Sequence, residues 1–152
     1  MATTAPRSMK DCLQWLEGLE AAPEVRATGA WPLSAVLDHL AQSVEMSIDG
    51  FPQPRSVLFQ QTAGRAAFAV FRMRGSMKHG LAQPIPGAAM LAAGADWLPA
   101  AQRLRAAIVR FDSYNGPLMP HFAYGALGKS DFELAHCMHI ADHQREIVRG
   151  DV

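Results

Sequence analysis

The sequence predicts an all-α fold, an antiparallel four-helix bundle with an additional short helix and a long loop rich in glycine and proline. Four long segments place apolar residues at three- and four-residue spacing, which is the period of an amphipathic helix. No stretch shows the sustained polar and apolar alternation that is typical of a strand. We therefore expect the helices to pack their apolar faces around one core.

The first two helices have clear end signals. Residues 8–21 form the first, because Ser8 is a suitable N-cap and Pro23 closes the segment. The second opens at Pro32, since proline suits a first helical turn, and it stops at Gly50.

A less regular segment, residues 56–73, predicts the additional short helix. Glycines and prolines then interrupt residues 74–94, which predicts the long loop. Helical periodicity returns over residues 95–113. The last helix is expected to start at an N-cap, Ser130, with Glu133 completing a capping box, and to run to about residue 149.

Length and charge limit the classes of protein. The 152 residues, 49% of them hydrophobic, predict a single domain over residues 1–152. The formal net charge is zero, so neither nucleic acid nor an anionic membrane is an expected partner. The N-terminus lacks the apolar core of a signal peptide, and no apolar run reaches membrane-spanning length, which favours a cytoplasmic protein. Cys12 and Cys137 are expected to be reduced thiols.

The last helix carries three histidines, His136, His139 and His143, at positions i, i+3 and i+7. At about 100° per residue they point within roughly 60° of one another. Phe132 and Ile147 share that face, so the imidazoles should meet the core. An unpaired buried polar group costs about 1–3 kcal/mol, and a metal ion would supply a partner for two or three rings at once.

His139 and His143 are the stronger ligand candidates, because the i,i+4 spacing lets two imidazoles converge on one ion. His39, inside the second helix, can supply a third ligand from a facing helix, although a boundary histidine bonded to a carbonyl or water is the alternative. His136 has several readings: a third ligand, a group behind the ligands or in the pocket wall (which we favour), a core histidine, or the fourth ligand of a closed structural site.

Two acids lie close to these histidines. Asp142 is three residues after His139, and Glu146 is three residues after His143, so either is placed to accept a ring N–H. The interpretation we favour from the sequence is a pair of surface carboxylates bound to Arg145 or Arg149. The remaining histidines and the large aromatic residues receive no catalytic role, and Cys137 points about 100° away from the ligand direction. Those histidines are His79 and His121 in loops, and the expected core anchors are Trp31, Trp97 and Phe111.

Two stretches carry a family resemblance. Trp31-Pro-Leu-Ser-Ala-Val-Leu-Asp-His39-Leu and His139-Ile-Ala-Asp-His143-Gln-Arg-Glu-Ile147 resemble the DinB-like superfamily of four-helix bundles. Its members bind a divalent metal through one histidine on the second helix and two on the last, which correspond here to His39, His139 and His143. Many relatives continue His-Arg-Gly-Gln where this chain has His143-Gln-Arg-Glu. Within the superfamily, His39-Leu-Ala-Gln-Ser, Gly50-Phe-Pro and His121-Phe-Ala-Tyr-Gly125 resemble a bacterial family of unknown function.

The resemblance implies a divalent metal, zinc or nickel, and a small-molecule substrate of unknown identity. Better-understood relatives are metal-dependent transferases and isomerases that use a low-molecular-weight thiol, namely bacillithiol, mycothiol or glutathione. Two alternatives stay open: a metal-dependent hydrolase, for which Glu146, Asp142 and His136 are weak candidate bases, and a non-catalytic bundle with a structural metal or none. Relatives often pair through bundle faces, which favours a homodimer.

Overall fold

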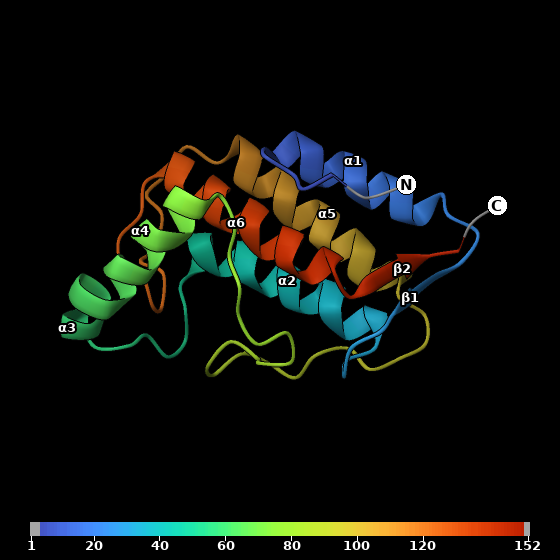
Figure 1. Cartoon of the computed structure of the whole chain (residues 1–152), viewed down its shortest axis with the longest axis horizontal. Coiled ribbons are helices and arrows are strands. Elements are labelled where there is room, and N and C mark those ends of the chain that lie inside the picture. The colour runs from blue at the N-terminus through green and yellow to red at the C-terminus, as the bar shows by residue number, and fades with distance from the viewer. Residues whose placement is uncertain (1–3, 151–152) are drawn as a thin grey trace.

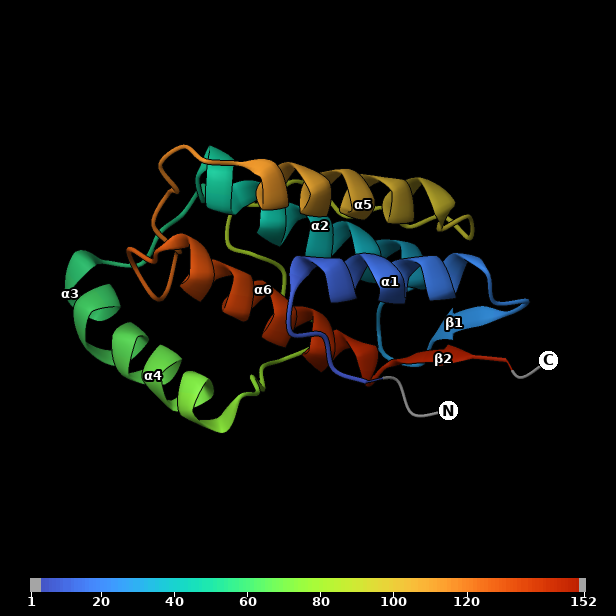
Figure 2. The same cartoon turned by 90° about the horizontal axis from the view of Figure 1, so that it is seen from above.

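Helices make up most of the computed structural model, which describes residues 4–150. Four long helices lie side by side, and a small sheet lies at one end of them (Figures 1 and 2). The helices are α1 (Met9–Glu20), α2 (Leu33–Asp49), α5 (Leu98–Ser113) and α6 (Lys129–Gln144). The prediction of a helix-rich chain is therefore confirmed.

The four helices share one apolar core. Leu16, Leu37, Leu104 and Phe132 represent α1, α2, α5 and α6 in this cluster, and all four side chains are fully buried. Phe111 is also fully buried, whereas Trp31 and Trp97 pack against the cluster while only partly buried. No described helix combines the length and the apolar character needed to cross a membrane.

The first helix starts as expected, but the last does not. The Ser8 hydroxyl caps α1 by accepting the Asp11 N–H at 3.1 Å. Helix α6 is capped at Gly128 instead of Ser130, and Glu133 accepts the N–H of Met9 at the start of α1 instead of closing a capping box. Tertiary contacts between helix ends thus displace the local capping pattern.

A short antiparallel sheet corrects the expectation of an all-helical chain. Strand β1 (Val25–Ala27) pairs with β2 (Ile147–Arg149), so α6 ends at Gln144 and does not continue to residue 149. Three-residue strands are too short to show alternation, and their partners lie more than a hundred residues apart. Sequence periodicity could not reveal this pairing.

The expected short helix is broken into three parts, α3 (Val57–Phe59), a π-helical turn η1 (Gln60–Gly64) and α4 (Arg65–Arg74). Figure 2 shows this segment standing away from the four long helices. At Gly64 a Cβ atom would lie 1.7 Å from the carbonyl oxygen of Ala123, so the close approach requires glycine.

The long loop before α5 is attached along one face of α2. Ser34, Asp38 and Gln42 are spaced four residues apart and are all buried. Their side chains form hydrogen bonds of 2.7 to 3.0 Å with the backbone of residues 89–94. This face of α2 therefore fixes a segment that has no regular structure of its own.

Candidate metal centre

Four histidines from three parts of the chain converge at one point. His39 comes from α2, His139 and His143 come from α6, and His79 comes from the long loop. One nitrogen of each ring lies within 4.8 Å of the chosen nitrogens of the other three, so the group could hold a metal ion. No role was expected for His79, because the sequence of an aperiodic loop does not indicate where its histidine lies in the fold.

The spacing of two of these rings suits a shared ion. The Nε2 atoms of His39 and His139 lie 3.1 Å apart, and the planes of the two rings are inclined by 81°. Two nitrogens bound to one tetrahedral zinc ion would lie about 3.3 Å apart, given bonds of about 2.0–2.1 Å.

Several ring nitrogens in the cluster are buried without a partner. The Nε2 atoms of His79 and His143 and the Nδ1 atom of His39 have no hydrogen-bond partner among residues 4–150. Such groups are rare in folded proteins, because each one destabilises the folded state by about 1–3 kcal/mol through lost hydration. A cation would accept the lone pairs of the free Nε2 atoms of His79 and His143, so these two donors fit a metal ion, whereas an ion bound to His39 Nε2 leaves His39 Nδ1 without a partner in the described chain.

A carboxylate lies close to the Nδ1 atom of two of the rings. The Nδ1 atom of His143 lies 3.1 Å from Oε1 of Glu146, and the Nδ1 atom of His79 lies 2.6 Å from Oδ2 of Asp142. A carboxylate behind an imidazole fixes the tautomer and directs Nε2 towards a metal. Glu146 lies where it can accept the ring N–H of His143, as one of the two interpretations of the sequence had it.

Asp142 differs from what the spacing suggested. It pairs with His79 and not with His139, and its Oδ2 also accepts the backbone N–H of His79 at 3.1 Å. It pairs with Arg145 as well, as the surface alternative proposed, yet Asp142 itself is only 4% exposed. Asp142 therefore attaches the loop to α6 and presents the His79 ring.

Glu146 is buried too, at 5% exposure, and contacts His143 instead of a surface arginine. Burial and the nearby Asp142 carboxylate raise its pKa. The turn around it is closely packed: Thr28 donates to its carbonyl oxygen, and a Cβ atom at Gly29 would lie 2.4 Å from Oε2. Contacts with Thr28 and Gly29, the residues that follow β1, thus fix the Glu146 carboxylate behind His143.

Burial keeps the histidines of the cluster neutral. It lowers the pKa of His39 to about 3 and that of His143 to about 4, with smaller contributions from neighbouring rings. Burial also holds the pKa of His139 well below 6.5 and lowers that of His79. A neutral imidazole is the form that binds a metal, so the site is preorganised for a cation at neutral pH.

His136 stands outside the cluster. Its Nε2 lies 3.1 Å from the hydroxyl of Ser47, and its ring packs against Phe111 and Phe132. Among the expected roles, the structure supports a buried histidine in the wall of a pocket, because the ring also borders the cavity described next. The fourth imidazole of the cluster is His79.

A cavity of about 300 Å³ adjoins the cluster. His39, His79 and His139 border it on one side, and Arg55, His121 and Tyr124 border it elsewhere. His121, which the sequence left without a role, is fixed by the backbone: its Nδ1 accepts the N–H groups of Ala123 and Tyr124, each at 3.1 Å.

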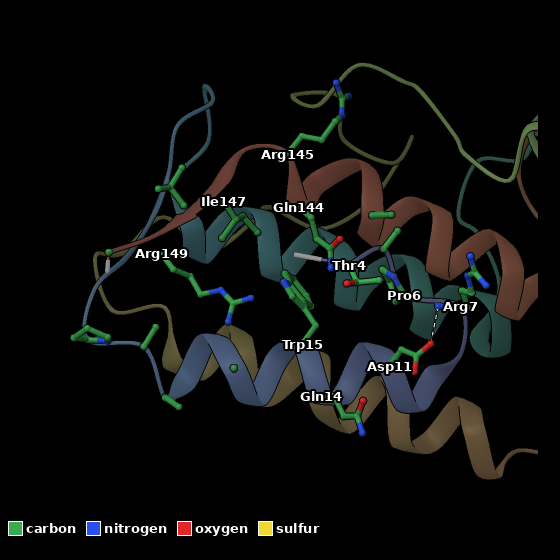
Figure 3. A pocket seen from close by; sticks show the side chains of 18 residues that line it. Thr4, Pro6, Arg7, Asp11, Gln14, Trp15, Gln144, Arg145, Ile147 and Arg149 are labelled. Carbon is green, nitrogen blue, oxygen red and sulfur yellow. Dashed lines mark hydrogen bonds between the residues drawn. The ribbon is translucent and has the colours of Figure 1, made fainter. Parts of the chain in front are cut away.

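A second, larger hollow lies elsewhere. It is an open groove between the start of the described chain, α1 and the end of α6, and Figure 3 shows Trp15, Gln144 and Ile147 around it. None of the four clustered histidines lines it. The smaller cavity, and not the larger groove, is therefore the one that adjoins the candidate metal site.

Fold and site together define a helix-rich protein with a four-histidine cluster that could hold a metal ion. Residues 8–150 match the family described as a protein of unknown function (DUF1569), and the chain belongs to this family. No curated protein and no solved structure matches the chain.

Proposed function

We propose that this protein binds one divalent metal ion in a DinB-like four-helix bundle. His39, His139 and His143 would be its ligands, and His79 would be a further donor from the loop. The observation that carries the proposal is the convergence of buried Nε2 atoms of His79 and His143, which lack partners, on the close pair formed by His39 and His139. Imidazole donors suit zinc and nickel, which are the ions we expect.

The proposed reaction is transfer of a low-molecular-weight thiol to a small electrophile in the adjoining cavity. A bound divalent ion would stabilise a thiolate or lower the pKa of a water molecule. No aspartate or glutamate lines this cavity in the described chain, and Glu146 and Asp142 are engaged behind the rings. Water attack usually needs a general base, and besides the clustered rings the lining offers, among the described residues, only His121 and His136 for that role. Burial lowers the pKa of each to about 3, so both are weak bases near pH 7 and the lining supports thiol transfer over hydrolysis.

A structural metal is the second candidate, and one observation favours it. With His79 included the cluster offers four nitrogen donors, and closed four-ligand sites are typical of structural zinc. The cavity favours the first candidate, because it gives small molecules a space next to three of the four rings.

Metal analysis of protein purified without a histidine tag tests the proposal. We expect about one zinc or nickel ion per chain, and its loss in His39→Ala and His139→Ala. Unchanged metal content in both variants would refute this ligand set.

Cobalt substitution separates the two candidates. For the enzyme, we expect glutathione, bacillithiol or mycothiol to change the visible spectrum of the bound cobalt. If none of the three thiols changes the cobalt spectrum and chelation lowers the melting temperature, the structural site is supported instead.

A further inference from the structure

The cavity beside the histidines carries an unneutralised cation. Arg55 is the only lysine or arginine that borders it, and no carboxylate borders it within residues 4–150. The Arg55 guanidinium has no carboxylate partner in the described structure. Arg55 is exposed and, like Arg7, Arg26, Arg65 and Arg74, forms no ion pair in the described part of the chain, so its place in the wall of the cavity is what distinguishes it.

The backbone and an aromatic ring fix the position of Arg55. Its N–H donates to the carbonyl of Phe122 at 2.8 Å, and its own carbonyl accepts from the side chain of Gln60 at 3.0 Å. The guanidinium carbon lies 4.0 Å from the centroid of the Phe59 ring. A stacked guanidinium keeps its N–H groups free for a planar anion.

His121 adds a neutral donor to the same cavity. Because its Nδ1 accepts two backbone N–H groups, the ring proton of the neutral form is on Nε2. Burial lowers its pKa to about 3, so the ring stays neutral near pH 7. Met77, Ile85, Phe122 and Tyr124 supply apolar surface around these two polar groups.

We propose that this cavity binds a small carboxylic acid with an apolar, planar body. Its carboxylate would pair with Arg55, and His121 Nε2–H is a second donor. Arginine matches a carboxylate in a two-pronged geometry, and the lining offers no like charge to repel it. The inference rests on the proposed function, since it assigns a substrate class to the cavity that the metal would face.

Calorimetry with benzoate and its neutral analogue benzamide tests this assignment on zinc-loaded protein. We expect wild type to bind benzoate about 10-fold or more tightly than benzamide, as a charge-assisted pair predicts. Arg55→Gln should lose about 10-fold of the benzoate affinity while benzamide binding stays within about twofold. Arg55→Lys should lose less benzoate affinity than Arg55→Gln, because lysine keeps the positive charge although it lacks the paired N–H donors of a guanidinium.

Arg65→Gln is the matched control, because Arg65 is exposed and borders neither hollow. Equal benzoate affinity in wild type and Arg55→Gln would overturn the inference. So would a parallel loss of benzamide binding, or an equal loss in Arg65→Gln. Metal content measured on the same samples keeps the two proposals apart. A wild type that retains neither zinc nor nickel refutes the metal site, whereas benzoate affinity that depends on Arg55 still supports the carboxylate site.

Discussion

Helix α6 carries two kinds of histidine within about two turns, and all three residues are buried or half-buried. His136 has a hydroxyl partner and two aromatic neighbours, whereas His139 and His143 meet imidazoles from α2 and the long loop. All three have a pKa lowered by burial. The comparison shows that neither burial nor a lowered pKa distinguishes a core histidine from a candidate ligand. The distinction lies in which atoms face the ring nitrogens.

The largest expected difference between the two regions is in metal affinity. His139→Ala should weaken zinc binding by about 100- to 1000-fold, because one of a few ligands carries about 3–4 kcal/mol of the binding free energy. Competition with a chromophoric chelator measures this. His136→Gln is the control and should bind zinc like wild type. Equal losses in both variants would mean that the two regions act as one site.

For the free energy of unfolding we expect the reverse order, with the larger effect at His136. His136→Ala removes a ring that is 3% exposed and packed between two phenylalanines, so we expect unfolding to cost about 3 kcal/mol less. Urea unfolding measures this change. His136→Gln should lose less, since its amide can still reach Ser47. Full stability in His136→Ala would show that this ring is not part of the packed core.

The same ring should make stability depend on pH. The pKa of His136 falls from 6.5 in the unfolded chain to about 3 in the folded protein. The unfolded chain therefore binds the extra proton between these values, and the free energy of unfolding falls as the pH falls through this window. The slope is about 1.4 kcal/mol per pH unit for one group, which gives about 2 kcal/mol at pH 5.

Urea unfolding of wild type and His136→Gln from pH 7 to pH 4, at matched metal content, isolates this contribution. Wild type should lose stability faster than the variant as the solution is acidified. Parallel curves would contradict the assignment of a neutral, buried ring at this position.

The smallest expected effect comes from the carboxylate behind His143. Glu146→Gln keeps an acceptor but removes its charge, so zinc affinity should fall by about 10-fold. Glu17→Gln, on the exposed side of α1, should leave zinc affinity unchanged. An unchanged affinity in Glu146→Gln would indicate that the carboxylate serves the fold alone.

The sequence predicted the parts of the site that lie on regular helices. Periodicity placed His139 and His143 on the apolar face of the last helix and left His39 at the boundary of its own, and the family resemblance implied that the three meet. His79 escaped detection because its position depends on Asp142 and on hydrogen bonds between α2 and the loop, which no local pattern encodes. For Glu146 the sequence offered a contact with His143 as one interpretation and favoured a surface carboxylate, because its burial depends on the β1–β2 pairing, which joins distant segments.

The zinc-loaded crystal, measured above and below the zinc absorption edge, tests the central claim most directly. We predict one anomalous peak at about 2.0–2.1 Å from nitrogens of His39, His139 and His143, with His79 beside it and none at His136. A peak elsewhere, or no peak at these rings in protein that carries zinc, would contradict the metal centre.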